Sequence, residues 1–386
     1  MALSRPIGIA LVGTGYIADS YRFCLDLHRP DIRLVGAFDR DAGRLQSFTS
    51  FWGDPAFGSF EELLGADGVD IVVNLTDPHA HFEVSQRILE AGRNLYTEKP
   101  LAMTAVEARA LRDLAAARGL KAASAPCNLL GESAQTLWQA VRRQQVGQVR
   151  LVYAELDDGM IHRVDRANWQ SRSGKPWPAA GEFSVGCTFE HAGYIVTLLV
   201  AMFGPVEEVT AFSALCLPDK DVAPIHGGFA PDLSVGCLRF AGGVVARLTN
   251  SIVAPYDHRL RVIGDDGVLV VPEPWNYNCP VQMVPTSVGR LARLLDRRFA
   301  IRMGRKLPLA RPCPLPRGRG VPTMDFMRGV RELGEAIIEG RPSRLDADLA
   351  VHITEVTEIL QHPDRFERPA RVESRFAPIA PMPWAA

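Results

Sequence analysis

The chain has 386 residues, which predicts two domains at a typical length of roughly 150 to 200 residues each. Hydrophobic residues make up 47% and charged residues 23%, a globular composition that excludes a disordered, collagenous or coiled-coil protein. The 43 Lys and Arg residues nearly balance the 44 Asp and Glu residues, so the net charge of −1 argues against nucleic acid as a partner.

The cysteines and the apolar runs indicate where such a protein would reside. Seven cysteines without a closely spaced pair supply neither a zinc motif nor a disulfide framework, and a reducing compartment is expected. No apolar run reaches the ~18 residues of a membrane span, and the stretch 194–203 is typical of a core helix. No signal peptide is visible before the apolar run at Ile7. We therefore expect a soluble, cytoplasmic protein without a membrane span.

Short β-rich runs alternate with helical patterns up to about residue 126, which is typical of βαβ units on a parallel sheet. Ser59 with Glu62 and Thr104 with Glu107 have capping-box spacing and predict two helix starts. A first α/β domain is therefore expected over residues 1–126. Its predicted strands are 7–12, 33–38, 70–75, 94–97 and 121–125.

Longer strands separated by hairpin turns follow residue 126, and they indicate a mainly antiparallel sheet. A second α/β domain is therefore predicted over residues 127–386. Its predicted hairpins are 235–240 with 244–249 and 259–263 with 268–271, and its late helices are about 324–339 and 345–360.

A basic, Pro-rich insertion is expected at about residues 285–320. Between Arg290 and Arg319 it is rich in arginine and holds a single acidic residue, Asp296. It is either a solvated insertion or a surface for an anionic membrane or a phosphorylated substrate such as a nucleotide-sugar. Because it is polar and interrupted by prolines, we expect it to add little to the core.

The run Gly13-Thr14-Gly15-Tyr16-Ile17-Ala18 follows the first strand and opens a helix, which is the setting of a dinucleotide fingerprint. Asp39 ends the second predicted strand, where a carboxylate binds the ribose hydroxyls of the adenosine. That carboxylate would repel a 2′-phosphate, so NAD is expected and NADP is less favoured. The neighbouring Arg40 keeps NADP open as the alternative.

Two further segments follow the third and fourth strands, Thr76-Asp77-Pro78-His79-Ala80-His81 and Thr97-Glu98-Lys99-Pro100-Leu101. Together with the glycine run, their composition and spacing resemble the Gfo/Idh/MocA family of oxidoreductases over the N-terminal half. The resemblance implies a Rossmann domain followed by an α/β domain with a large open sheet. The predicted cofactor contacts are Gly13, Gly15, Tyr16, Ile17, Asp39, Arg40, Thr76, Pro78, His81, Glu98 and Lys99.

The resemblance implies a catalytic role for Lys99 beside the nicotinamide. There its pKa is expected to fall next to the positive ring, while its ammonium still binds a carbinol or carbonyl oxygen. The alternative is a solvated surface lysine. For His79 and His81, helix capping and cofactor contact remain equally open. No third ligand accompanies these two histidines in the sequence, so no metal site is predicted.

The family's second catalytic motif usually reads DxGxHxxD, and this chain departs from it with GCTFEHAGY at residues 186–194. His191 is in register as a general base, with a core histidine as the alternative. Cys187 and Tyr194 stand where the family has carboxylates, and both are expected on the helix face of His191. Glu190 is expected to turn away from that face. Without the usual carboxylate, a neutral His191 is expected near pH 7.

Tyr194 is predicted to be catalytic through a hydrogen bond to the substrate or the imidazole, and Cys187 to line the substrate site as a small apolar group. The run 168–177 holds Trp169, Arg172 and a second tryptophan, which either bind a sugar ring or pack a loop.

These residues together predict an NAD(P)-dependent oxidoreductase that interconverts a secondary alcohol and a ketone. The expected substrate is a sugar, a sugar derivative including a nucleotide-sugar, or a cyclitol. A glycosidase that uses NAD transiently and a non-catalytic dinucleotide sensor are the alternatives, since the family includes both. A homo-oligomer formed through the C-terminal sheet is also expected.

Overall fold

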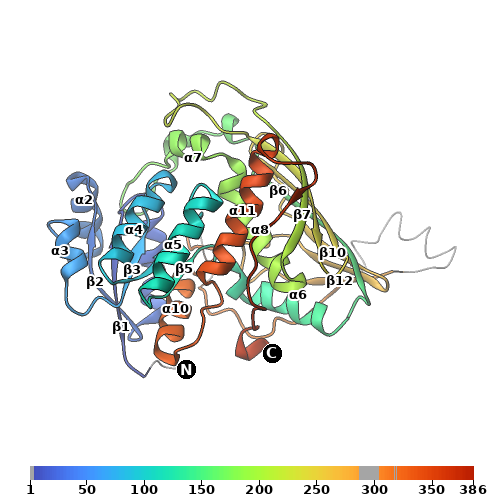
Figure 1. Cartoon of the computed structure of the whole chain (residues 1–386), viewed down its shortest axis with the longest axis horizontal. Helices are drawn as coiled ribbons and strands as arrows, with labels where there is room; N and C mark the ends of the chain where they lie inside the picture. The colour runs from blue at the N-terminus through green and yellow to red at the C-terminus, as the bar shows by residue number, and fades with distance from the viewer. Residues whose placement is uncertain (1–3, 287–303, 317, 319) are drawn as a thin grey trace.

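The computed structural model describes residues 4–286, 304–316, 318 and 320–386 (Figure 1). Residues 287–303, in the first part of the basic insertion, lie outside the described residues.

The N-terminal sheet is parallel throughout, with strand order β2-β1-β3-β4-β5, as the sequence predicts for a Rossmann domain. The strands are β1 (Ile7–Val12), β2 (Ile32–Phe38), β3 (Ile71–Asn74), β4 (Asn94–Thr97) and β5 (Ala122–Ser124). Every residue of β1 is buried, as expected for a strand covered on both faces. The helices that connect the strands are α1 (Ala18–Leu25), α2 (Ala42–Trp52), α3 (Phe60–Gly65), α4 (His81–Glu90) and α5 (Ala105–Ala117). Both predicted caps are confirmed, because Ser59 and Thr104 accept hydrogen bonds from the amides of Glu62 and Glu107.

Helices from the end of the chain complete the cover of this sheet (Figure 1). The core that contains Ile7 and Tyr96 also contains Val330 of α10 (Met327–Glu339). The opposite core contains Val72 together with Val351 of α11 (Ala347–Gln361). Gly329 permits the close approach of α10, since any side chain there would overlap the Tyr96 hydroxyl. Both predicted late helices are therefore present, and they start two or three residues later than expected.

The C-terminal sheet has the strand order β13-β12-β11-β10-β6-β9-β8-β7-β14. All neighbouring strands run antiparallel except β6 and β9, so the predicted mainly antiparallel sheet is confirmed. Its strands are β6 (Val149–Asp157), β7 (Val206–Ala214), β8 (Leu233–Phe240), β9 (Val245–Ser251), β10 (Leu260–Gly264), β11 (Gly267–Val271), β12 (Gln282–Pro285), β13 (Arg305–Lys306) and β14 (Ala370–Arg371).

Strand β6 is preceded in the chain by helix α6 (Glu132–Arg142). It is followed by helices α7 (Ala179–Val185) and α8 (Cys187–Phe203). Helices α8 and α11 pack on strands β7, β8 and β9. Among the described helices, none alone is long and apolar enough to span a membrane, and α7 with α8 meets those limits only as a pair bent by 69°.

The described end of the basic insertion packs against the protein, contrary to the expectation that it adds little to the core. Leu307 and Leu315 are at most 9% exposed and belong to the main core. Arg311 forms an ion pair with the fully buried Glu132. The Arg311 guanidinium also lies over the Trp384 ring. Apolar residues spaced between the prolines therefore anchor residues 304–316.

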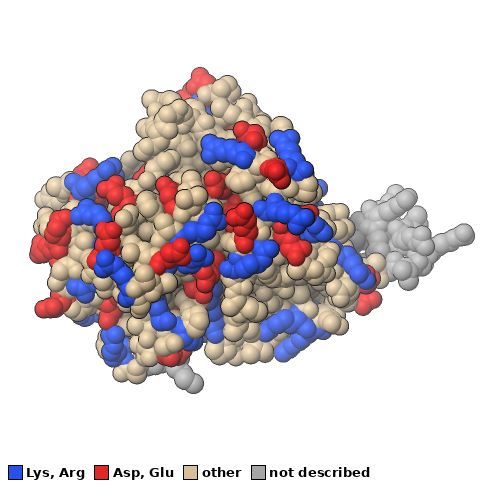
Figure 2. All heavy atoms as spheres, viewed as in Figure 1, with Lys and Arg blue, Asp and Glu red and all other residues tan. Residues whose placement is uncertain are grey.

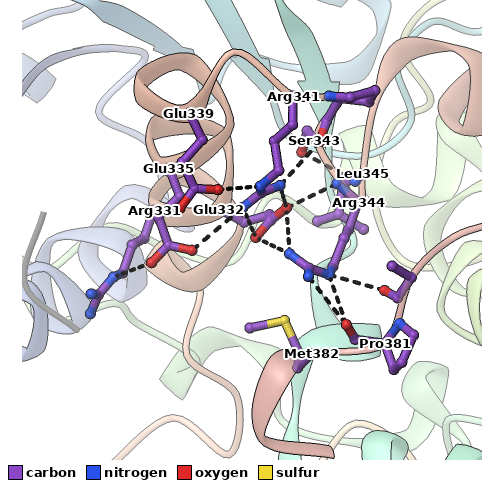
Figure 3. A network of polar contacts seen from close by, with 12 residues as sticks. Arg331, Glu332, Glu335, Glu339, Arg341, Ser343, Arg344, Leu345, Pro381 and Met382 are labelled. Carbon is purple, nitrogen blue, oxygen red and sulfur yellow. Dashed lines mark hydrogen bonds and ion pairs between the residues drawn. The ribbon is translucent and has the colours of Figure 1, made fainter. Parts of the chain in front are cut away.

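An ion-pair network joins α10 to the C-terminal tail (Figure 3). The buried Glu332 accepts hydrogen bonds from the guanidinium groups of Arg341 and Arg344 and from the backbone amide of Arg344. Arg344 also donates to the carbonyl of Pro381. One carboxylate therefore fixes both arginines and, through Arg344, the tail.

Acidic and basic side chains are interspersed over the face that Figure 2 shows, where the blue and red groups alternate. On this face, charged side chains of both signs therefore lie in small groups.

Candidate active site

A cleft of about 1780 Å³ lies where the carboxyl ends of strands β1–β4 meet the beginning of α8. Ligands of open parallel sheets bind at this edge, because the loops after the strands converge there. Most of the predicted site residues border it: Gly13, Gly15, Tyr16, Ile17, Asp39, Arg40, Thr76, Pro78, His81, Glu98, Lys99, Trp169, Cys187, His191 and Tyr194.

The glycine turn has the shape that a dinucleotide pyrophosphate requires. Gly13 has a φ of +91°, and a Cβ there would lie 2.7 Å from the carbonyl carbon of Leu75. A Cβ on Gly15 would meet nothing within 4 Å, so the backbone at this position is open to the cleft. The residues present therefore fit a dinucleotide whose phosphates approach the backbone at the start of α1.

Asp39 ends β2 and borders the cleft with its carboxylate already bound to the glycine turn. Its Oδ2 accepts from the Thr14 amide at 2.8 Å, and its Oδ1 accepts from the Asp41 amide at 2.9 Å. These bonds fix the carboxylate at the position predicted for ribose binding. Arg44 lies 3.8 Å from Oδ1, and it borders the cleft together with Arg40 and Lys175.

The residues after β3 and β4 are held by local hydrogen bonds. His81 begins α4 and is fully buried, with Nδ1 2.6 Å from the Pro100 carbonyl and Nε2 3.0 Å from the Thr76 carbonyl. It therefore ties the two loops together while also bordering the cleft. Glu98 accepts from the Tyr21 hydroxyl at 2.7 Å and from the Lys99 amide at 2.9 Å.

His79 has a possible metal-binding neighbourhood that the sequence did not reveal. Ligand atoms of Asp77, His79 and His226 lie within 4.8 Å of one another. However, the two imidazoles stack at 4.0 Å with planes 21° apart. Nearly parallel rings do not direct their lone pairs at one point, as metal ligands must. In this arrangement the three residues form a stacked imidazole pair beside a carboxylate.

Lys99 forms an ion pair with Glu190, although the sequence led us to expect that Glu190 turns away. The Lys99 side chain is 18% exposed and that of Glu190 only 5%. Residues 187, 190, 191 and 194 of a helix span an arc of about 100°. All four residues border the cleft. The expectation that Glu190 turns away was wrong because the cleft is wide enough to include all four positions on the helix.

The groups around Lys99 set its charge. Burial alone would lower the pKa of Lys99, but the carboxylate of Glu190 outweighs burial and holds the pKa well above its ordinary value. The fall expected next to a bound nicotinamide is a separate effect and stays a prediction. Glu182, at the cleft wall in α7, lies beside Glu190. Burial and the charge of Glu190 raise the pKa of Glu182, which favours a protonated Glu182.

His191 has a carboxylate neighbour after all, supplied by Asp158 at the end of β6. The two side chains approach to 3.6 Å between Nε2 and Oδ2. Burial lowers the pKa of His191, and the charge of Asp158 opposes this only in part, so a neutral imidazole is favoured as expected. His191 Nδ1 is buried without a hydrogen-bond partner among the described residues, whereas Nε2 is the nitrogen that lies beside Asp158.

Sequence reasoning did not identify Asp158, Glu182 or Trp275 as residues of the site. Asp158 follows a β-rich run and precedes Gly159, so polar residues at a strand end were the available signal. Trp275 lies in a loop after β11 and borders the cleft. Its ring is 4.7 Å from that of Tyr194 and 5.5 Å from that of His191.

Tyr194 and Cys187 both border the cleft and are nearly buried. Burial raises the pKa of the Tyr194 hydroxyl, so the group is a neutral donor at ordinary pH. Cys187 packs in an apolar cluster with Ile161, Phe183 and Ile252. Burial raises the pKa of its thiol, in line with the small apolar role predicted for it.

Trp169 borders the cleft, whereas Arg172 is placed elsewhere. The Trp169 ring meets that of Trp177 edge-on at 5.3 Å, so this tryptophan both packs the loop and faces the cleft. Arg172 donates to the Gly320 carbonyl at 2.6 Å, and its guanidinium lies 4.2 Å from the Phe23 ring centre. Because those contacts hold it, Arg172 is absent from the described cleft lining.

Comparison with known proteins identifies the family to which this fold belongs. A family model described as an oxidoreductase family with an NAD-binding Rossmann fold matches residues 7–125, and the GFO/IDH/MocA C-terminal domain matches residues 134–270. A trans-1,2-dihydrobenzene-1,2-diol dehydrogenase from Oryctolagus cuniculus is 25% identical over 71% of this chain and 77% of its own length.

Two solved structures share the fold. The WlbA dehydrogenase from Bordetella pertussis, in complex with NADH and UDP-GlcNAcA, superposes with a TM-score of 0.69 at 16% identity, covering 95% of this chain and 97% of that one. The aldose-aldose oxidoreductase from Caulobacter crescentus, complexed with glycerol, gives 0.70 at 20% identity, covering 94% and 98%.

The Rossmann fold, the open glycine turn and the lysine-carboxylate-histidine cluster define an oxidoreductase that uses a nicotinamide dinucleotide. The two matching family models cover the parallel sheet and strands β6 to β10 of the second sheet. This chain belongs to the Gfo/Idh/MocA family of oxidoreductases.

Proposed function

We propose that this protein is an NAD-dependent dehydrogenase or reductase that interconverts a secondary alcohol and a ketone on a sugar, a sugar derivative or a cyclitol. The observation that carries the proposal is the meeting of Lys99 and His191 in one cleft with the glycine turn. A charged ammonium and a neutral imidazole are the two groups that alcohol oxidation needs besides the hydride acceptor.

The dinucleotide, when bound, supplies the hydride acceptor or donor. In the oxidation direction the His191 imidazole takes the proton of the substrate hydroxyl, which requires the neutral ring that burial favours. Lys99 donates a hydrogen bond to the same oxygen and stabilises its negative charge as it develops. Glu190 holds Lys99 charged and in place. In reduction, the same atoms return the proton.

Residues at the two ends of the cleft support the choice of cofactor and substrate. Asp39 is fixed where free ribose hydroxyls would be bound and a 2′-phosphate repelled, which favours NAD over NADP. Trp169 offers a flat apolar face at the cleft wall and Tyr194 a hydroxyl, a combination that suits a polyhydroxylated ring. The WlbA dehydrogenase and the aldose-aldose oxidoreductase, which share the fold, support a sugar or nucleotide-sugar substrate, and the diol dehydrogenase supports oxidation of a secondary alcohol.

Self-association through the C-terminal sheet belongs to the proposal. One face of this sheet is covered by α8 and α11. On the other face, Phe212 is 62% exposed and Leu151 36%. A second copy of the chain covering this face would form a homo-oligomer, which light scattering can detect. A cytoplasmic location is supported by seven cysteines that are all free.

The proposal is tested by incubating the purified protein with NAD and a panel of polyols, free sugars and nucleotide-sugars while nicotinamide absorbance is recorded. Net formation of NADH with one class of substrate supports it. Cleavage of a glycoside without net NADH would indicate transient use of the cofactor. Tight NAD binding with no turnover on any substrate would indicate a sensor.

A further inference from the structure

Beyond the cleft, a connected group of polar side chains runs from His191 toward the surface. Asp158 stands between His191 and His258, and His258 stands between Asp158 and Glu273. These residues come from the end of β6, the segment before β10 and the segment after β11. Chain segments far apart in sequence therefore place two histidines and two carboxylates in alternation.

The distances show how firmly Asp158 is held. His258 Nε2 lies 3.2 Å from Asp158 Oδ1, and His258 Nδ1 lies 3.2 Å from Glu273 Oε1. The Tyr256 hydroxyl donates to Glu273 and lies 2.9 Å from His258 Nδ1. His258 is only 1% exposed, and its ring packs 4.4 Å from that of Trp275. A histidine enclosed in this way has one orientation, and its ion pair with Asp158 helps to position that carboxylate.

We propose that Asp158 supplies the carboxylate missing from position 187 and stabilises the positive charge that His191 acquires when it takes the substrate proton, while His258 and Glu273 act as positioning residues for Asp158. This inference rests on the proposed role of His191 as the general base. Asp158 lies beside Nε2 and is 26% exposed, so it differs from the buried aspartate that binds Nδ1 in a catalytic triad, and it stabilises the imidazolium through its negative charge.

The charges agree with this geometry. Burial alone would raise the pKa of Asp158, but the neighbouring His258 and the charge of His191 lower it, so Asp158 stays a carboxylate. Burial would lower the pKa of His258, yet Asp158 and Glu273 together raise it to about 9. His258 is therefore a cation at pH 7, which suits a residue that holds one carboxylate on each side.

The groups that face His191 come from several elements. Asp158 favours the charged ring, as does Glu190 on α8, whereas Lys99 and His258 disfavour it. Replacing Asp158 with an isosteric amide removes one favourable charge and leaves the other three. The pKa of His191 must then fall further below its ordinary value.

The first test uses no substrate, so it is independent of the proposed activity. The histidine ring signals of the full-length protein are titrated by NMR, with His191 assigned by its loss in His191→Gln. Asp158→Asn is expected to lower the pKa of His191 relative to wild type. An unchanged His191 titration in a folded Asp158→Asn would overturn the proposal.

The second test uses the substrate found in the screen. Asp158→Asn is expected to lower kcat about 10²-fold with the Kd of NAD within about twofold of wild type. His258→Ala is expected to lower kcat about tenfold, because a misplaced carboxylate stabilises the imidazolium poorly. His258→Gln keeps a donor at the position of Nε2 and is expected to recover most of that loss.

Asp257→Asn is the matched control, since Asp257 precedes His258 and its carboxylate binds Arg259 at the surface. It is expected to leave kcat unchanged. Wild-type kcat in both Asp158→Asn and His258→Ala would overturn the proposal. A His258→Gln variant as impaired as His258→Ala would overturn the positioning role of His258. Absence of turnover in the wild type would contradict the proposed function alone and leave the NMR result to decide on Asp158.

Discussion

Lys99 and Glu190 form an ion pair across the junction of the two domains, joining the loop after β4 to the first turn of α8. The pair keeps an ammonium charged inside a largely buried site, where burial alone would favour the neutral amine. It also links the dinucleotide side of the cleft to the helix that carries His191.

Glu190→Gln tests what this pair does to the protonation of Lys99. Without the carboxylate, burial dominates and the pKa of Lys99 falls. Because the ammonium is charged below its pKa and neutral above it, the variant should lose kcat/KM at a lower pH than wild type. A pH–rate profile measures this. An alkaline limb at the same pH in both proteins would contradict the role assigned to Glu190.

Asp39 provides the test of cofactor preference. NAD is expected to bind at least about tenfold more tightly than NADP, since a tenfold ratio requires only ~1.4 kcal/mol. Asp39→Ala should narrow this ratio by weakening NAD and by releasing Arg44, which lies 3.8 Å from the carboxylate, to meet a 2′-phosphate. Calorimetric titration of both proteins with both dinucleotides decides the matter. Equal or tighter binding of NADP to the wild-type protein would contradict the predicted preference for NAD.

Tyr194 and Cys187 occupy the two positions where the family motif has carboxylates, and we expect them to differ in effect. Tyr194→Phe removes a cleft hydroxyl and should lower kcat about 10²-fold or more if that hydroxyl takes part in proton transfer. Cys187→Ala removes a small buried thiol and should change kcat little. Steady-state kinetics of both folded variants would reverse this assignment if only Cys187→Ala were impaired.

If Tyr194 only packs against Trp275, Tyr194→Phe will lower the melting temperature with no selective loss of kcat. Thermal denaturation beside the kinetic assay separates the two roles of this residue.

Glu332 is expected to matter for stability alone. Glu332→Ala leaves the guanidinium groups of Arg341 and Arg344 without their shared buried carboxylate, and should lower the free energy of unfolding by about 3–5 kcal/mol. Glu335→Ala on the same helix is the control. The Glu335 side chain is 25% exposed, so its loss should cost less than about 1 kcal/mol. Urea denaturation showing equal effects would contradict the importance of the Glu332 network.

The sequence predicted the elements whose signals are local. Strands β1 and β4 begin and end where expected, and the Ser59 and Thr104 caps are present, because apolar runs and cap spacing need no distant partner. The same holds for the glycine turn and for Asp39 at the end of β2. These parts of the dinucleotide site are set by residues close together in the chain.

The rest of the site depends on contacts between distant segments. Helix geometry alone predicts that Glu190 turns away from the face of His191. The ion-pair partner of Glu190 is Lys99, which lies in the other domain and cannot be inferred from that helix. Asp158 and His258 meet only when β6 and β10 pair in the sheet. Arg172 was expected at the substrate but binds Gly320, a residue far along the chain. None of these contacts leaves a periodic or motif signal in the sequence.

Transfer of the carbinol hydrogen tests the central claim most directly. The substrate from the screen is labelled with deuterium at the reacting carbon and mixed with NAD and either wild type or Lys99→Ala, and the recovered dinucleotide is analysed by mass spectrometry. The account predicts deuterium in the reduced nicotinamide with wild type. Lys99→Ala should bind NAD normally but transfer at least about 10²-fold more slowly. Turnover without deuterium in the nicotinamide, or a Lys99→Ala variant that transfers it at the wild-type rate, would contradict the account.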